Sequence, residues 1–142
     1  MKDIKLFERE LDLIVNEDLR MLTKAYLEER VADYFWEIGA SSSGKYHPSF
    51  SQNVGGLVRH TKAVVMFAEE LLRMNTYAYL NEEYKDYIIV ACLVHDTCKL
   101  LGIRCALNFL SLFVNEVFPV YHFHSKILCC FCAIAIIVGH YY

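Results

Sequence analysis

The sequence predicts an all-α fold, and three observations support this prediction. Apolar residues recur at spacings near 3.6 through most of residues 3–100, with charged residues between them. Residue types that favour helix ends stand where these stretches start and stop. No segment alternates apolar and polar residues as a half-buried strand does, and no internal repeat is present. At 142 residues, the chain is long enough to bury a core within one domain.

Three helices are expected in the first 38 residues. The first starts near residue 3, the second spans about 16–26, and the third spans about 28–38. The apolar stripe of the third helix comprises Val31, Tyr34, Phe35 and Ile38. Gly39 should end this helix, because Gly often follows a helix C-terminus.

An amphipathic helix is expected over residues 57–74, after a loop over 40–48 and the pair Gly55-Gly56. Its apolar face carries Leu57, His60, Val64, Phe67 and Leu71. Its charged face carries Arg59, Lys62, Glu69 and Arg73, of which Arg59 and Lys62 are expected to be solvated. His60 should therefore point inward, and a core histidine with a hydrogen-bond partner is the structural alternative to a functional role. The two glycines should allow a tight turn into the helix.

A last helix is expected over residues 81–100, with Asn81 as its N-cap and acidic residues in its first turn. Its apolar residues lie nearly all round, which is typical of a central, buried helix. Ile88, Ala91 and His95 share a face, and Asp96 follows directly. An imidazole and a carboxylate in so apolar a setting need partners, because burying them unpaired costs several kcal/mol or more.

The composition limits the kind of partner and the compartment. The net charge of −3 gives no broad basic surface that would favour nucleic acid. The N-terminus enters a charged amphipathic segment without the apolar stretch of a secretory signal, so a cytoplasmic location is expected. In that reducing compartment the six cysteines are not expected to form disulfides.

Charge falls sharply after residue 104, which divides the chain into a helical domain over 1–104 and an apolar segment over 105–142. The second part carries Glu116 and Lys126 as its formal charges. Its uncharged run over 127–139 is shorter than the ~20 residues of a membrane helix. Three interpretations remain open: a terminal helix that completes the core, a membrane-associated segment, and the product of a truncation or frameshift in a longer protein.

His60, His95 and Asp96 are candidate metal ligands. Mixed imidazole and carboxylate donors favour Mn, Fe, Co, Ni or Mg over a thiolate zinc site. Two helices would supply three ligands and leave positions open for water and substrate, as a catalytic metal requires. Lys99 lies one helical turn beyond His95, within reach of a bound phosphate.

These residues resemble the HD-domain metal-dependent phosphohydrolase superfamily. The resemblance is carried by Gly-Gly-Leu-x-x-His over 55–60, His-Asp-x-x-Lys over 95–99, and the loop Ser-Ser-Ser-Gly-Lys-Tyr-His-Pro over 41–48. It covers about residues 30–104 and is similar to small bacterial and phage-type HD proteins and to the HD domain of a bacterial 3′–5′ exoribonuclease.

The resemblance implies an HD-like helical bundle that hydrolyses a phosphoester or phosphoanhydride, in a nucleotide or at a nucleic-acid end. His60, His95 and Asp96 match metal ligands, and the residue matching Asp96 bridges two ions in two-metal members. Lys99 matches a position near the substrate phosphate. His47 either lines the pocket or is an ordinary loop histidine. The expected partners are a phosphorylated small molecule or nucleotide, with nucleic acid as an alternative, and a membrane is not expected.

One departure from the family pattern concerns the ligand set. The family supplies a further Asp ligand on a later helix, whereas this chain has no Asp after Asp96. His122 and His124 are candidate substitutes. The departure leaves two alternatives to an active enzyme: a catalytically impaired domain that binds metal or nucleotide without turnover, and a protein that associates with a membrane or partner through its apolar segment.

Overall fold

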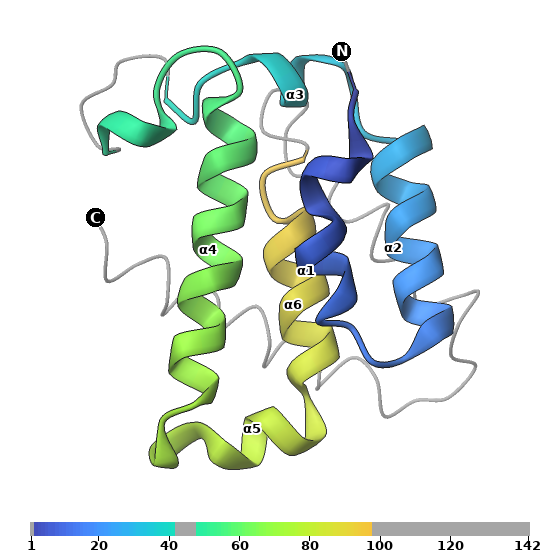
Figure 1. The fold of residues 1–142 in the computed structure, drawn as a ribbon, viewed down its shortest axis with the longest axis vertical. Helices are drawn as coiled ribbons and strands as arrows, with labels where there is room; N and C mark the ends of the chain where they lie inside the picture. Colours follow the sequence, from blue (N-terminus) through green and yellow to red (C-terminus); the bar gives the residue numbers. More distant parts are fainter. Residues whose placement is uncertain (1, 42–47, 98–142) are drawn as a thin grey trace.

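A computed structural model describes residues 2–41 and 48–97 of the chain (Figure 1). Throughout these residues the regular structure is helical and no strand is present, which confirms the all-α prediction. The 3-10 helices (η) and α-helices (α) are η1 (Ile4–Phe7), α1 (Glu8–Asp12), α2 (Glu17–Glu29), α3 (Tyr34–Glu37), η2 (Ser49–Ser51), α4 (Gly56–Leu72), η3 (Asn75–Tyr77), α5 (Ala78–Glu83) and α6 (Lys85–Val94).

Helices α1, α2, α4 and α6 lie side by side with similar axis directions, and α5 crosses one end of this bundle (Figure 1). Helix α6 packs against both α4 and α2. The bundle buries a core that all these helices share, including Leu11, Leu27, Val65 and Ile89. Helix α6, which is far from α2 in the sequence, is thus held next to it.

An aromatic cluster closes the end of the bundle at which α3 lies. The ring centroids of Phe7, Phe35 and Trp36 are 5.5–6.2 Å apart, and all three side chains are buried. Such pairs add about 0.5–1.5 kcal/mol beyond the burial of their area. The cluster anchors the short helix α3 to the start of the chain.

The expected third helix over 28–38 is wrong in extent. Helix α2 starts after Asn16, whose side chain caps the amide of Leu19 as expected of a helix start, but it continues to Glu29. The amides of Arg30 and Val31 both donate to the Tyr26 carbonyl, which ends the helix, and α3 is a single turn. The turn between them brings Val31 into the core.

The buried face of α4 is rotated by about one residue from the predicted stripe. Apart from Leu57, the predicted members are only half-buried, whereas the fully buried line runs through Val58, Thr61, Val65, Ala68 and Leu72. Thr61 belongs to the core because its hydroxyl donates to the Leu57 carbonyl at 3.0 Å, so no polar group is left unsatisfied. His60 lies at the edge of this face rather than at its centre.

The single helix expected over 81–100 is two helices in the structure. Tyr84, with φ −123° and ψ 0°, separates α5 from α6, and Asn81 lies inside α5 instead of capping a helix start. The expectation of a central helix is confirmed, because α6 is buried on several sides through Ile88, Ile89, Val90, Cys92, Leu93 and Val94. At its start, the Asp86 carboxylate accepts hydrogen bonds from the amides of Val15 and Asn16, which ties α6 to the α1–α2 connection.

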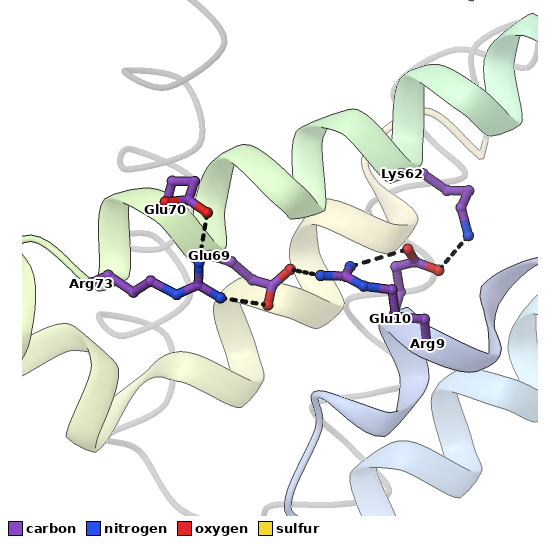
Figure 2. A network of polar contacts seen from close by, with 6 residues as sticks. All are labelled: Arg9, Glu10, Lys62, Glu69, Glu70 and Arg73. Atoms are coloured by element: carbon purple, nitrogen blue, oxygen red, sulfur yellow. Dashed lines mark hydrogen bonds and ion pairs between the residues drawn. The ribbon is translucent and has the colours of Figure 1, made fainter.

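A network of charged side chains joins α1 to α4 (Figure 2). Glu10 is only 2% exposed and lies 2.7 Å from the ammonium of Lys62, while Arg9 lies 2.7 Å from a carboxylate oxygen of Glu69. The hydrogen bond and the charge of Glu69 raise the pKa of Arg9. The expectation that Lys62 is solvated is therefore wrong, because its ammonium pairs with the buried carboxylate of Glu10. The assignment of Glu69 to the outer face is also wrong, because Glu69 is buried and pairs with Arg9.

In the described part of the chain, no helix has the length and apolar character needed to cross a membrane. The apolar segment over 105–142, with His122 and His124, lies outside the described residues, so its three interpretations stay open.

Candidate metal centre

The start of α4 places His60 in the bundle, and two glycines determine how the chain reaches it. Gly55 adopts a left-handed conformation with φ 69°, which favours Gly. At Gly56 an added Cβ would lie 2.2 Å from the Ser51 carbonyl oxygen and 2.9 Å from the Cα of Gly39. Backbone groups cannot move aside as a flexible side chain can, so the predicted tight turn depends on Gly at both positions.

Arg59 holds the loop that precedes α4. Its guanidinium donates hydrogen bonds to three backbone carbonyls, those of Phe50, Gln52 and Val54. The residue is exposed, as expected of a solvated charge, and these hydrogen bonds to the loop were not predicted. Arg59 thereby fixes the loop that leads into α4, the helix that carries His60.

His95 and Asp96 lie in the turn that follows α6. The Nδ1 atom of His95 is 2.7 Å from the carbonyl oxygen of Cys92. A carbonyl only accepts, so Nδ1 carries the proton and Nε2 of the neutral ring has a free lone pair. A histidine that ligates a metal commonly donates its other ring N–H in this manner.

The three candidate ligands converge on one point. His60 Nε2 lies 3.4 Å from His95 Nε2, and each of these nitrogens lies 3.5 Å from Asp96 Oδ2. All three side chains are largely buried, with 14%, 11% and 20% of their area exposed. The histidine rings are tilted at 57° to each other, with centroids 5.5 Å apart. The predicted association of His60 with His95-Asp96 is thereby confirmed.

The triangle of donor atoms has the size that a metal ion requires. A point equidistant from three atoms about 3.5 Å apart lies about 2.0 Å from each, and metal bonds to imidazole nitrogen and carboxylate oxygen are about 2.0–2.2 Å long. Among the described residues, His60, His95 and Asp96 are the group of this kind that could hold a metal ion. The alternative is a hydrogen-bonded cluster in which a protonated imidazole satisfies Asp96.

Two predicted site residues, His47 and Lys99, lie outside the described residues, so their roles stay predictions. The Cys92 carbonyl was not predicted, although its place three residues before His95 on a helix puts the two groups within reach. The hydroxyls of Tyr26 and Tyr34 contact Thr97, which follows Asp96 in the same turn. None of these three residues was predicted to belong to the site. The tyrosines lie more than 60 residues away in sequence, and no local pattern marks such contacts.

Comparison with family models, curated proteins and solved structures gave no match for this chain. The assignment to the HD superfamily therefore stays a hypothesis that rests on the motifs at 41–48, 55–60 and 95–99.

Proposed function

We propose that this protein is a metal-dependent phosphohydrolase that acts on a phosphoester or phosphoanhydride, in a nucleotide or at a nucleic-acid end. The observation that carries the proposal is the convergence of His60 Nε2, His95 Nε2 and Asp96 Oδ2 within 3.5 Å of one another. The motif resemblance to HD phosphohydrolases supplies the reaction class, and the convergence supports the metal site that this reaction would require.

The composition of the ligand set suits an anionic substrate. Two neutral imidazoles and one carboxylate contribute a single negative charge, so a divalent ion held there keeps a net positive charge toward phosphate. Such an ion supplies Lewis acidity for a phosphoryl oxygen and lowers the pKa of water. Three protein ligands leave sites in a six-coordinate shell of Mn, Fe, Co, Ni or Mg.

The residues themselves have separate tasks in this proposal. Asp96 would supply the anionic ligand for an ion held between α4 and the end of α6. Lys99 offsets charge on the substrate phosphate as the transition state forms. His47 lines the approach to the phosphate. The last two roles rest on the sequence motifs.

Loss of the site should abolish turnover while the fold persists. With Mn²⁺ present, the wild-type chain should release phosphate from at least one member of a panel of nucleotides and 3′- or 5′-phosphorylated oligonucleotides. Asp96→Asn and His95→Gln should each lower the rate by more than about 100-fold, because partners in the outer shell of a metal already contribute about 10–100-fold.

A matched control is Glu70→Gln, which neutralises an exposed carboxylate on α4 outside the site. It should retain wild-type activity. Silence of the metal-loaded wild-type chain across the whole panel would contradict the proposal.

A second candidate function is metal or nucleotide binding without turnover. It is favoured by the sequence, which has no Asp after Asp96 to match the family's further ligand. Calorimetry separates the two functions. Wild-type chain that binds Mn²⁺ with a loss of affinity in Asp96→Asn, yet hydrolyses no member of the panel, supports the binding function over the enzyme.

A further inference from the structure

We propose that Tyr26 and Tyr34, acting through Thr97, position Asp96 for the metal ion. This inference rests on the proposed metal-dependent function, because it assigns a task to residues around that same site. Neither tyrosine contacts the ion in this proposal, so both are positioning residues rather than ligands.

Thr97 is held by both tyrosines. The Tyr34 hydroxyl donates to the Thr97 carbonyl at 3.1 Å, and the Tyr26 hydroxyl lies 3.0 Å from Thr97 Oγ1. Tyr26 belongs to α2 and Tyr34 to α3, so two elements restrain this one residue. Thr97 itself is 2% exposed, which excludes water as a competing partner for most of its surface.

The direction of these hydrogen bonds follows from the number of protons. Thr97 has a single hydroxyl proton, and it donates that proton to the Val94 carbonyl at 2.8 Å. Its oxygen can then only accept from Tyr26, whose hydroxyl is the donor. The chain Tyr26 to Thr97 to Val94 is therefore directed, and it ends on the last residue of α6.

Asp96 lies beyond the end of α6 at Val94, in a turn that the Thr97 amide closes by donating to the Val94 carbonyl at 3.2 Å, so its position depends on how Thr97 is held. On its N-terminal side, the His95 ring is held by the Cys92 carbonyl at 2.7 Å. On its C-terminal side, Thr97 is held through its hydroxyl and its carbonyl. Both chain neighbours of Asp96 are therefore held in place, which keeps its Oδ2 atom 3.5 Å from the Nε2 atoms of His60 and His95.

The expected consequence is on metal affinity rather than on folding alone. Groups that orient metal ligands from the outer shell typically change affinity by about 10–100-fold when they are removed. Tyr26→Phe and Tyr34→Phe keep the rings and delete only the hydroxyls. Each should weaken Mn²⁺ binding by about 10-fold, and the double variant should weaken it further.

The experiment is calorimetric titration of the full chain with Mn²⁺, combined with thermal unfolding of each metal-free variant. Thr23→Val is the matched control, because it removes a buried hydroxyl on α2, the helix that carries Tyr26, and this hydroxyl donates to the Leu19 carbonyl at 2.7 Å instead of to Thr97. It should lower thermal stability and leave Mn²⁺ affinity within about two-fold of wild type.

A pair of substitutions at Thr97 tests the same contact from the other side. Thr97→Ser keeps the hydroxyl and should retain affinity, whereas Thr97→Val loses it and should match Tyr26→Phe. This pair keeps the test decisive even if a tyrosine variant fails to fold.

The outcomes distinguish failure of the positioning role from failure of the proposed metal-dependent function. Weaker Mn²⁺ binding in Tyr26→Phe, Tyr34→Phe and Thr97→Val, with Thr23→Val and Thr97→Ser unaffected, supports the positioning role. Equal affinity in all of them, with wild-type chain binding Mn²⁺, overturns the positioning role alone. A wild-type chain that binds no Mn²⁺ overturns the proposed metal site and the positioning role with it.

Discussion

The His95 imidazole links the backbone of α6 to the candidate metal centre, and its two nitrogens have different tasks. Nδ1 faces the Cys92 carbonyl and Nε2 faces His60 and Asp96. Because the carbonyl must accept, the backbone selects the tautomer that leaves Nε2 available as a ligand. The ring is thereby held in the tautomer that a metal ligand would require.

This geometry predicts the tautomer of the metal-free protein. At a pH where His95 is neutral, Nδ1 should carry the proton and Nε2 should not, because the contact with the Cys92 carbonyl stabilises that form. Nitrogen-15 NMR distinguishes the two ring nitrogens, and a His95→Gln sample assigns the signals. A His95 ring with its proton on Nε2 would contradict the prediction.

The sequence allowed the association of the three candidate ligands to be predicted, but not the groups that hold them in place. His60 and the His95-Asp96 pair stand in short motifs whose spacing is visible in the chain. Tyr26 and Tyr34 are ordinary half-buried tyrosines of α2 and α3, and folding alone brings them to Thr97. Contacts of this kind depend on tertiary packing, which a local pattern does not encode.

At the scale of elements, α4 illustrates which features a hydrophobic pattern can predict. The existence and limits of the helix were predicted well, since 57–74 differs little from Gly56–Leu72. The buried face was misplaced because Thr61 and Glu69 enter the interior with polar partners of their own. The break at Tyr84 was missed because no Gly or Pro marks it, and the capping residues at 81–83 lie inside α5.

The charge network between α1 and α4 predicts unequal effects on stability (Figure 2). Lys62→Met removes the cation 2.7 Å from the carboxylate of Glu10, which is 2% exposed and remains paired only with the longer contact of Arg9 at 3.4 Å. Loss of one partner of a fully buried pair costs about 3–5 kcal/mol, and the half-exposed Lys62 lowers this to about 2 kcal/mol.

The matched substitution is Glu70→Met, which breaks the Arg73–Glu70 pair. This pair is similarly short at 2.6 Å but lies on the surface, with both side chains more than 60% exposed, and Arg73 keeps its contact with Glu69 at 3.7 Å. The substitution should change the free energy of unfolding by less than about 1 kcal/mol. Urea unfolding monitored by circular dichroism measures both variants. Equal losses in the two would show that burial of Glu10 does not decide the strength of the network.

For the whole molecule, the candidate metal centre is also a junction. His60 comes from α4, whereas His95 and Asp96 follow α6, so an ion bound to all three would join two helices that pack directly against each other. An all-α bundle could be predicted because helical periodicity is strong through the first 100 residues. The relative placement of its helices could not, because it is determined by contacts such as Asp86 with the amides of Val15 and Asn16.

Metal binding across this junction should stabilise the entire fold, since an ion that binds only the native state shifts the unfolding equilibrium by mass action. At Mn²⁺ concentrations 100 times the dissociation constant, the gain should be about 2.7 kcal/mol, which corresponds to a rise in Tm on the order of 10 °C. Differential scanning calorimetry of the full chain, with EDTA or with Mn²⁺, measures the shift. Asp96→Asn should lose it, whereas Glu70→Gln should keep it, because that carboxylate lies outside the site. A rise of equal size in Asp96→Asn would mean that Mn²⁺ acts on surface carboxylates instead of on the junction between α4 and α6.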